Sequence, residues 1–342
     1  MIETEASLLP PFYAQWKSLP ASLRPPVLTT AQKVWRILWN ILSVLIPIIG
    51  LTRLAAYGAA VLSRRLLLPA AYYSAEFKEM WEQQFQCICR FRSSDFEVVP
   101  TQVVTPDGAA LSTTLFRHRK GNEATPVVID FQGNASLKGM GSWDWILQDS
   151  IDKNIPVNLV VFDYRSVGKS TGTFTRPKDL VVDGSSIVDW IRTVMKTPDD
   201  RINLYGMSLG GAVAVKTMAA DERLTGWIVN ERSFSSLETL IRAWASHLSW
   251  FLKPLVPIVI WTLKNQDLEL DAAADMEKLK ARKLVVYHAA DPVVLYRGSM
   301  ARKFPQHAFQ LQGGCNIDNH HCAGLENYDG ARERVSKFML NR

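Results

Sequence analysis

Residues Gly206-Met207-Ser208-Leu209-Gly210 form the pattern G-x-S-x-G, which can hold a serine ready for nucleophilic attack. A β-type run, 201–205, precedes the pattern, and a run rich in good helix formers, 211–220, follows it. A strand, a sharp turn and a helix together make a nucleophile elbow, with small glycines at the turn. We therefore predict that Ser208 is a catalytic nucleophile; the alternative is an ordinary glycine-rich turn.

A serine hydroxyl needs a base to take its proton, and the base needs a third group to orient it. Asp291 follows the apolar β-type run 283–288, so it lies on a loop just past a strand. Its alternative role is a solvated turn former beside Pro292. The chain order, with the acid after the nucleophile, favours Asp291 as the acid. Glu231, at the end of an earlier strand-like run, is the second candidate.

Three of the six histidines follow this acid: His307, His320 and His321. His307 lies within the last predicted strand, whereas His320 and His321 lie in the loop before the helical stretch 327–340. That loop is where the base of such a triad is expected. We prefer His321, because Leu325 four residues later would begin the final helix; His320 stays the alternative.

The intermediate of acyl transfer also needs hydrogen-bond donors for its oxyanion. One is the amide of Leu209, the residue after the nucleophile. The strand-like run 126–131 leads into a turn in which Gly133 would let the Asn134 amide point inward. We predict Leu209 and Asn134 as the oxyanion hole; a plain strand-to-helix turn is the alternative for Asn134.

Several segments resemble motifs of the α/β-hydrolase superfamily, namely Phe131–Ala135, Asp163–Gly172, Tyr205–Gly211 and the Asp291 loop. The resemblance is closest to serine hydrolases with F-H-G-N-A, D-Y-R-G-Y-G-x-S-x-G and Y-G-x-S-L-G-G, which include enzymes that remove fatty acyl groups from membrane-associated proteins. The chain is also similar to chlamydial CHLPS domain proteins and lipase-like Legionella effectors, which implies a bacterial effector that enters a host cell. Gln132 replaces the motif histidine, and Ser166-Val167 replaces Gly-Tyr.

The rest of the sequence predicts an α/β fold. Residues 97–104 and 109–117 alternate as an antiparallel pair joined at Pro106-Asp107-Gly108, and the helical stretch 180–196 follows the apolar strand 157–163. Apolar strands separated by helices indicate a mostly parallel sheet covered on both faces. We predict an α/β-hydrolase domain over residues 96–342.

An insertion at about 234–268 interrupts this pattern and is rich in large apolar residues. Pro254 and Pro257 break it. Its apolar residues could form a core-facing helical pair or a cap over Ser208 that lines a pocket for an acyl chain, and both can be true.

Residues 1–95 are predicted to be a separate helical, apolar and basic segment. Residues 37–52 carry no charge, but sixteen residues fall short of the ~20 that a spanning helix needs. A helical arm packed on the hydrolase and a monotopic membrane anchor are the two alternatives. No basic region precedes an apolar core, so we expect no signal peptide and a cytoplasmic or peripherally membrane-associated protein.

The charge is concentrated in this segment. Residues 1–75 contain seven basic and two acidic residues, so they account for +5 of the net +6 of the chain. A basic, apolar segment suits an anionic membrane surface. We predict no nucleic-acid partner, because the basic residues are scattered among Leu and Ile without a nucleic-acid-binding motif.

Length and composition, 342 residues with 47% hydrophobic content, fit one full hydrolase domain and a smaller segment. Cys315, His320, His321 and Cys322 could ligate a metal, but they would consume the proposed base, so we predict no metal and no cofactor. The predicted function is hydrolysis of an ester or thioester with an apolar acyl group, on a lipid or an acylated protein. The rival is a catalytically silent, hydrolase-like protein- or lipid-binding module.

Overall fold

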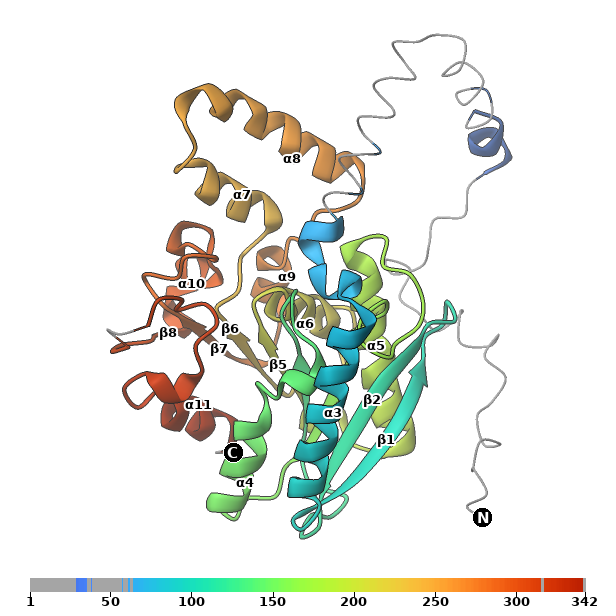
Figure 1. Cartoon of the computed structure of the whole chain (residues 1–342), viewed down its shortest axis with the longest axis vertical. Coiled ribbons are helices and arrows are strands. Elements are labelled where there is room, and N and C mark those ends of the chain that lie inside the picture. The colour runs from blue at the N-terminus through green and yellow to red at the C-terminus, as the bar shows by residue number, and fades with distance from the viewer. Residues whose placement is uncertain are drawn as a thin grey trace.

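The computed structural model describes residues 29–35, 38, 57, 61, 64–314 and 317–340. Within them, eight strands form one sheet in the order β1-β2-β4-β3-β5-β6-β7-β8 (Figure 1). The strands are β1 (Phe96–Val104), β2 (Ala110–His118), β3 (Val127–Phe131), β4 (Asn158–Phe162), β5 (Ile202–Met207), β6 (Trp227–Glu231), β7 (Arg282–Tyr287) and β8 (Ala308–Gln310).

Strands β1 and β2 form an antiparallel hairpin, and β2 runs antiparallel to β4. Every pair from β4 to β8 is parallel. Successive residues of a strand face opposite sides, so Val127, Ile129 and Phe131 enter one buried cluster and Val128 enters the other. The predicted fold class, a mostly parallel sheet with helices on both faces, is confirmed.

Helices cover both faces of the sheet. On one side lie α5 (Pro177–Val194), α6 (Leu209–Ala219) and α9 (Ala273–Lys278), and on the other lie α3 (Ala75–Arg92), α4 (Asp144–Asp152) and α11 (Ala331–Leu340) (Figure 1). The remaining helices are α7 (Leu237–Ala245), α8 (Val256–Asn265), α10 (Met300–Lys303) and the short 3₁₀ helices η2 (Pro69–Tyr72), η3 (Lys138–Met140), η4 (Asp199–Arg201), η5 (Trp250–Leu255), η6 (Tyr296–Gly298), η7 (Pro305–His307) and η8 (Leu325–Asn327).

Helix α7, η5 and helix α8 form a projection above the sheet, which we call the cap (Figure 1). It lies within the predicted insertion 234–268. Leu240 and Ala243 of α7 are buried, and the Trp244 Nε1–H donates to the Val293 carbonyl over 2.7 Å. The cap is therefore fastened at its base to the loop after β7.

Residues 68–92 of the N-terminal segment pack on the hydrolase domain, whereas the described residues 29–35, 38 and 57 are exposed. Leu68 and Ala70 are buried in the main core, and Phe85 of α3 is buried in the second cluster. The predicted boundary at residue 95 falls between α3 and β1. Among the described residues, no helix has the length and apolarity to cross a membrane. Nearly all of the predicted uncharged run 37–52 lies outside the described residues.

The packing of α3 yields a first test. The Phe85 ring lies 6.3 Å from the Phe116 ring and 6.1 Å from the Trp143 ring, centroid to centroid. Phe85→Ala should lower the free energy of unfolding by about 3–5 kcal/mol, because it leaves a cavity in a packed aromatic cluster. Chemical denaturation of the full chain measures it.

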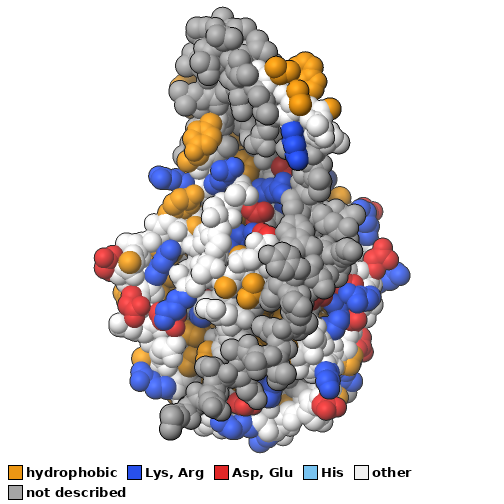
Figure 2. All heavy atoms as spheres, turned by 90° about the vertical axis from the view of Figure 1, so that its right-hand side faces the viewer, with side chains coloured by type: hydrophobic (Ala, Val, Ile, Leu, Met, Phe, Trp, Pro, Cys, Tyr) orange, Lys and Arg blue, Asp and Glu red, His pale blue; other side chains and the backbone are white. Residues whose placement is uncertain are grey.

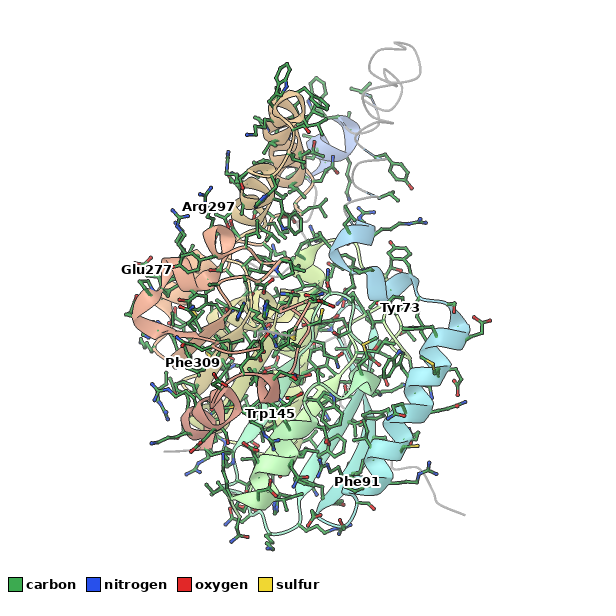
Figure 3. The ribbon with its side chains drawn as sticks, turned by 60° about the vertical axis from the view of Figure 1, so that its left-hand side comes forward. Tyr73, Phe91, Trp145, Glu277, Arg297 and Phe309 are labelled. Carbon is green, nitrogen blue, oxygen red and sulfur yellow. The ribbon has the colours of Figure 1, made fainter. Side chains whose placement is uncertain are left out.

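The matched control is Phe91 on the same helix, which is 72% exposed and points outward at the far end of α3 from the cap (Figure 3). Phe91→Ala should change the free energy of unfolding by less than about 1 kcal/mol. Equal effects of the two substitutions would contradict the packing of α3 described here.

Candidate active site

Ser208 occupies a strained turn between β5 and α6. Its backbone has φ 55° and ψ −123°, a conformation that residues other than glycine rarely adopt. The Ser208 amide donates to the Glu231 carbonyl over 2.9 Å, which ties the turn to the end of β6. Such strain persists only where surrounding structure enforces it, and it is concentrated at functional sites.

Glycine at position 210 makes this turn possible. A Cβ atom there would lie 1.9 Å from the Phe131 carbonyl oxygen, at the end of β3. A Cβ atom at Gly206 would lie 2.5 Å from the Gly210 carbonyl oxygen. The elbow and β3 can therefore approach only because both positions lack side chains.

Ser208, His321 and Asp291 form one hydrogen-bonded line. The Ser208 Oγ lies 2.9 Å from His321 Nε2, and His321 Nδ1 lies 2.8 Å from Asp291 Oδ2. All three side chains are buried. Because one ring nitrogen faces a carboxylate and the other a hydroxyl, the ring is set to accept the serine proton while Asp291 holds its Nδ1–H.

The loop after β7 fixes the Asp291 carboxylate. Its Oδ1 accepts hydrogen bonds from the amides of Val293 and Val294, both over 2.8 Å. The other oxygen, Oδ2, is left to face His321. The two amides therefore set the rotation of the carboxylate that orients the imidazole.

The other candidates make different contacts. The His320 ring stacks on His288 with centroids 3.7 Å apart, and its Nδ1 lies 3.2 Å from the Tyr328 hydroxyl. Burial, and then the neighbouring His320, lower the pKa of His288. His307 was predicted to lie within the last strand, but it is the last residue of η7, directly before β8; burial, and then Lys283, lower its pKa.

The side chain of Glu231, the second candidate for the acid, accepts hydrogen bonds from the Tyr205 hydroxyl and the Arg232 guanidinium. Its carboxylate thus has partners other than an imidazole. Arg232 was not singled out in the sequence, although a charged pair directly after an apolar strand is a signal that could have pointed to it.

The predicted oxyanion donors lie beside Ser208. Leu209 is the first residue of α6, where backbone amides have no acceptor within the helix. A Cβ atom at Gly133 would lie 3.7 Å from the Ser208 Cβ, so the turn that contains Asn134 lies against the serine.

Residues before α3 support this turn, which the sequence did not indicate. The Ala70 amide donates to the Asn134 carbonyl over 3.3 Å, and the Tyr73 hydroxyl donates to the Ala135 carbonyl over 2.8 Å. The Asn134 side-chain amide donates to the Leu66 carbonyl over 3.5 Å. The N-terminal segment therefore contacts the predicted oxyanion loop, and these bonds use backbone groups that leave little trace in the sequence.

The D-Y-R motif after β4 has a structural part. Arg165, which is 3% exposed, forms ion pairs with Asp107 at 2.5 Å and Asp183 at 2.7 Å. Burial raises the pKa of Asp183 to about 6 against the lowering effect of Arg165. These pairs join the β1–β2 turn to α5 and do not involve Ser208.

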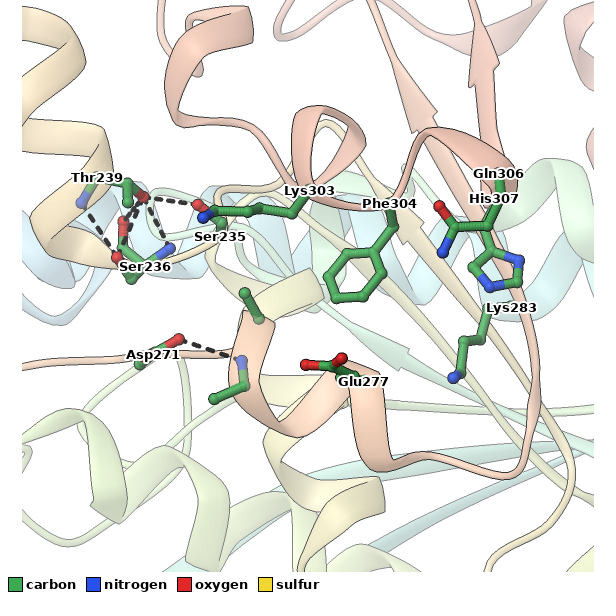
Figure 4. Close-up of a pocket in the computed structure, with 12 residues that line it drawn as sticks. Ser235, Ser236, Thr239, Asp271, Glu277, Lys283, Lys303, Phe304, Gln306 and His307 are labelled. Carbon is green, nitrogen blue, oxygen red and sulfur yellow. Dashed lines mark hydrogen bonds between the residues drawn. The ribbon is translucent and has the colours of Figure 1, made fainter.

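A cavity of about 570 Å³ lies between the start of α7, α9 and the segment from α10 to η7 (Figure 4). Its described lining includes none of the predicted site residues. Ser235, Ser236 and Thr239 at its edge bond to one another at the start of α7 (Figure 4). Lys283 and Glu277 bring opposite charges to the cavity, and we assign no chemistry to it.

Over the described residues, no group of three or more His, Cys, Asp or Glu side chains is arranged to hold a metal ion. Cys315, one of the four residues considered as metal ligands, lies outside the described residues.

The chain is similar to known proteins over part of its length. Residues 158–314 match the model of the X-Pro dipeptidyl-peptidase (S15 family). The chain is 33% identical over 115 residues to an uncharacterized protein of Acanthamoeba polyphaga mimivirus, covering 32% of this chain and 36% of that protein. It is 26% identical over 137 residues to protein bem46 of Schizosaccharomyces pombe, covering 40% and 44%. The matches therefore span less than half of each relative.

Among solved structures, the chain is similar to an esterase of Pyrococcus furiosus, with a TM-score of 0.53 and 17% identity over 72% of this chain and 91% of that one. At this identity the similarity shows the fold, which is the α/β-hydrolase fold. Together with the S15 match, it supports a serine hydrolase.

The close approach at Gly210 yields a second test. Gly210→Ala should lower the free energy of unfolding by about 1–3 kcal/mol or more, because the added methyl group meets the backbone of β3. Gly133→Ala is the control, since its Cβ would make ordinary contacts of 3.5 Å and 3.7 Å. Calorimetry of both variants measures the difference; an unchanged Tm for Gly210→Ala would refute the packing constraint.

Proposed function

We propose that this protein is a serine hydrolase that cleaves carboxylic esters or thioesters with an apolar acyl group. The observation that supports it most is the hydrogen-bonded line from Ser208 through His321 to Asp291, with distances of 2.9 Å and 2.8 Å. The strained backbone of Ser208 and the S15 family match add to it.

In the proposed mechanism, the Ser208 Oγ attacks the carbonyl carbon while His321 Nε2 takes its proton. Asp291 stabilises the imidazolium, and the amides of Leu209 and Asn134 donate to the oxyanion. Collapse of the intermediate breaks the bond to the alcohol or thiol, which receives the proton from His321. A water molecule, activated by the same base, then releases the acid from the acyl-enzyme.

The apolar character of the cap is evidence that the acyl group of the substrate is apolar. The cap is joined to the loop of the proposed acid through Trp244, and α8 carries apolar side chains on every side. Val256, Ile260 and Leu263 are buried between α8 and the rest of the cap. A mostly apolar wall with few polar groups is the usual lining of a lipid or acyl site.

The outer surface of the cap supports an anionic bilayer as the place where the substrate, a lipid or an acylated protein, lies. Its large apolar side chains are exposed, namely Trp244, Leu248, Trp250, Phe251, Leu255, Ile258, Val259 and Trp261. In the view of Figure 2, a few separate groups of apolar side chains lie toward the upper end of the molecule. The basic residues of the cap are Arg242, Lys253 and Lys264, and its one acidic residue, Glu238, pairs with Arg242 and Lys264. Exposed tryptophans beside basic residues are typical of membrane interfaces.

The N-terminal segment was the other predicted membrane contact, through Arg36, Arg53, Arg64 and Arg65. Arg36 and Arg53 lie outside the described residues. The Arg64 Nε–H donates to the Thr175 carbonyl over 2.7 Å, and Arg65 lies 5.1 Å over the Tyr72 ring. These contacts favour a packed arm for residues 64–73. Membrane contact is therefore proposed for the cap and for the residues that precede residue 64.

A third test concerns the triad. Ser208→Ala should lower kcat by several orders of magnitude, since removal of a triad nucleophile costs on the order of 10⁶ in subtilisin. His321→Ala should match it, and the double variant should lose almost nothing more, because the two residues act as one unit. Rates on a short p-nitrophenyl ester measure this.

His320→Ala is the neighbouring control and should keep most of the activity. A fluorophosphonate probe separates the enzyme from a silent binding module, because only an activated Ser208 is labelled. Retention of a tenth of the activity by Ser208→Ala would exclude the mechanism, and loss confined to His320→Ala would move the base to His320.

A fourth test concerns the bilayer. The protein should float with vesicles that contain phosphatidylserine, and less so at high salt, because charges are screened over a Debye length of ~8 Å at physiological ionic strength. Replacing Trp250 and Phe251 by serine should weaken this binding, and so should changing Arg36 and Arg53 to glutamine, at about 1 kcal/mol each.

Phe91→Ser is the matched control, because it removes an exposed aromatic ring at the far end of α3 from the cap (Figure 3). It should leave flotation unchanged. Absence from both neutral and anionic vesicles would rule out the bilayer. In that case a packed arm predicts a lower Tm once residues 1–75 are removed.

A further inference from the structure

We propose that Arg232 is a positioning residue for His321, and that Glu231 holds Arg232 in place for this task. The inference rests on the proposed function, since it concerns how the base of that triad is held. Glu231 and Arg232 stand at the end of β6, between the Ser208 turn and the loop that carries His321.

The guanidinium of Arg232 donates hydrogen bonds to backbone carbonyls on both sides of His321. Its Nη1 donates to the His320 carbonyl over 2.8 Å and to the Ala323 carbonyl. These carbonyls lie one residue before and two residues after His321. A planar guanidinium with several fixed donors can hold two acceptors at once, which a lysine ammonium does less well.

Glu231 contacts both halves of the site. Its carboxylate accepts from Arg232 Nη2 and from the Tyr205 hydroxyl, which orients the guanidinium. Its backbone carbonyl accepts the Ser208 amide over 2.9 Å. One dipeptide thus sets the position of the nucleophile through its main chain and of the base through its side chains.

The Glu231–Arg232 ion pair is costly to bury, which indicates that its role is to position the site and not to stabilise the fold. Arg232 is 3% exposed and Glu231 is 1% exposed, and a buried ion pair is often no more stabilising than apolar residues of the same size. Arg232 also has φ 46°, a left-handed conformation that is unfavourable for a residue other than glycine. The Arg232 amide donates to the Val286 carbonyl over 2.7 Å, which holds the main chain there.

The charges around the pair match this arrangement. Asp130 on β3, which β5 separates from β6, is buried, and burial together with the charge of Glu231 raises its pKa to about 8. The Arg232 guanidinium pairs with the Glu231 carboxylate through Nη2, which fixes its direction.

His321 needs this support because its hydrogen bonds to Asp291 and to Ser208 must form at the same time. His321 Nδ1 and Nε2 lie 2.8 Å and 2.9 Å from their partners, and the loop's own bond is from the His321 amide to the Asn319 side chain over 3.0 Å. The Tyr328 hydroxyl, which donates to the same His320 carbonyl over 3.1 Å, is a second support. A displacement of about 1 Å in such a site can cost 10²-fold in rate.

The decisive experiment uses Arg232→Lys in the full chain. We expect kcat on a short soluble ester to fall about 10²-fold with KM nearly unchanged, because the ammonium cannot hold the loop as the guanidinium does. The rate of fluorophosphonate labelling should fall in parallel. Combined with His321→Ala, the substitution should cause no further loss, because it acts through His321.

Arg165→Lys is the matched control. Arg165 is also 3% exposed and ion-paired to carboxylates, but it joins the β1–β2 turn to α5. It should lower the Tm and leave kcat per folded molecule unchanged. If Arg232→Lys and Arg165→Lys both lower only the Tm, Arg232 is a structural residue and the proposal is wrong.

If Arg232→Lys does not fold, Tyr328→Phe tests whether hydrogen bonds to the His320 carbonyl position His321. It removes one hydroxyl from the His320 carbonyl and should lower kcat about fivefold. An unchanged kcat would then overturn the proposal. Failure of the proposed function looks different: the wild-type protein would not be labelled by the probe, or His321→Ala would stay active.

Discussion

The contact between the Ser208 turn and the end of β3 is the constraint on which the rest of the site depends. Gly210 lies so close to the Phe131 carbonyl that a Cβ atom would stand 1.9 Å from it. This approach places the start of α6 against the turn that contains Asn134. Ser208 then has to adopt φ 55°, and its amide turns to the Glu231 carbonyl. The strain at the serine is thus a consequence of the packing of three neighbouring strands.

Each remaining group enters from a loop at the carboxyl end of a strand. Asp291 follows β7 and has its carboxylate fixed by two backbone amides, and His321 follows β8. Parallel strands end at one edge of the sheet, so residues far apart in sequence meet there without long connections. The order β3, β5, β6, β7, β8 also explains why Glu231 on β6 can reach both the serine turn and the histidine loop.

Much of this could be predicted because the signals are local. The apolar strands and the G-x-S-x-G turn predicted the sheet within a few residues; the strand expected at 157–163 spans Asn158–Phe162. Chain order suggested Asp291 and the loop of His320 and His321. It could not separate two adjacent histidines, because only the loop conformation decides which ring lies near Ser208.

The contacts that were missed join segments distant in sequence. Arg232 binds carbonyls 88 and 91 residues away, and Tyr73 binds a carbonyl 62 residues away. Every residue carries a backbone carbonyl, so no sequence pattern indicates which carbonyls accept these hydrogen bonds. A helical arm packed on the hydrolase was one of the two alternatives for the N-terminal segment, but the side chains that α3 buries could not be predicted, because its buried side is a short stripe of which Phe85 is the main apolar member.

The two segments outside the sheet meet the site at different loops. The cap is fastened through Trp244 to the loop of Asp291, and residues 66–73 are fastened to the loop of Asn134. In the proposed mechanism these loops carry the acid and an oxyanion donor. A force on the cap or on the N-terminal segment, such as contact with a bilayer, would therefore reach the groups that orient the base or bind the oxyanion. Binding and catalysis would then be coupled through two short hydrogen-bonded contacts, without any change in the sheet itself.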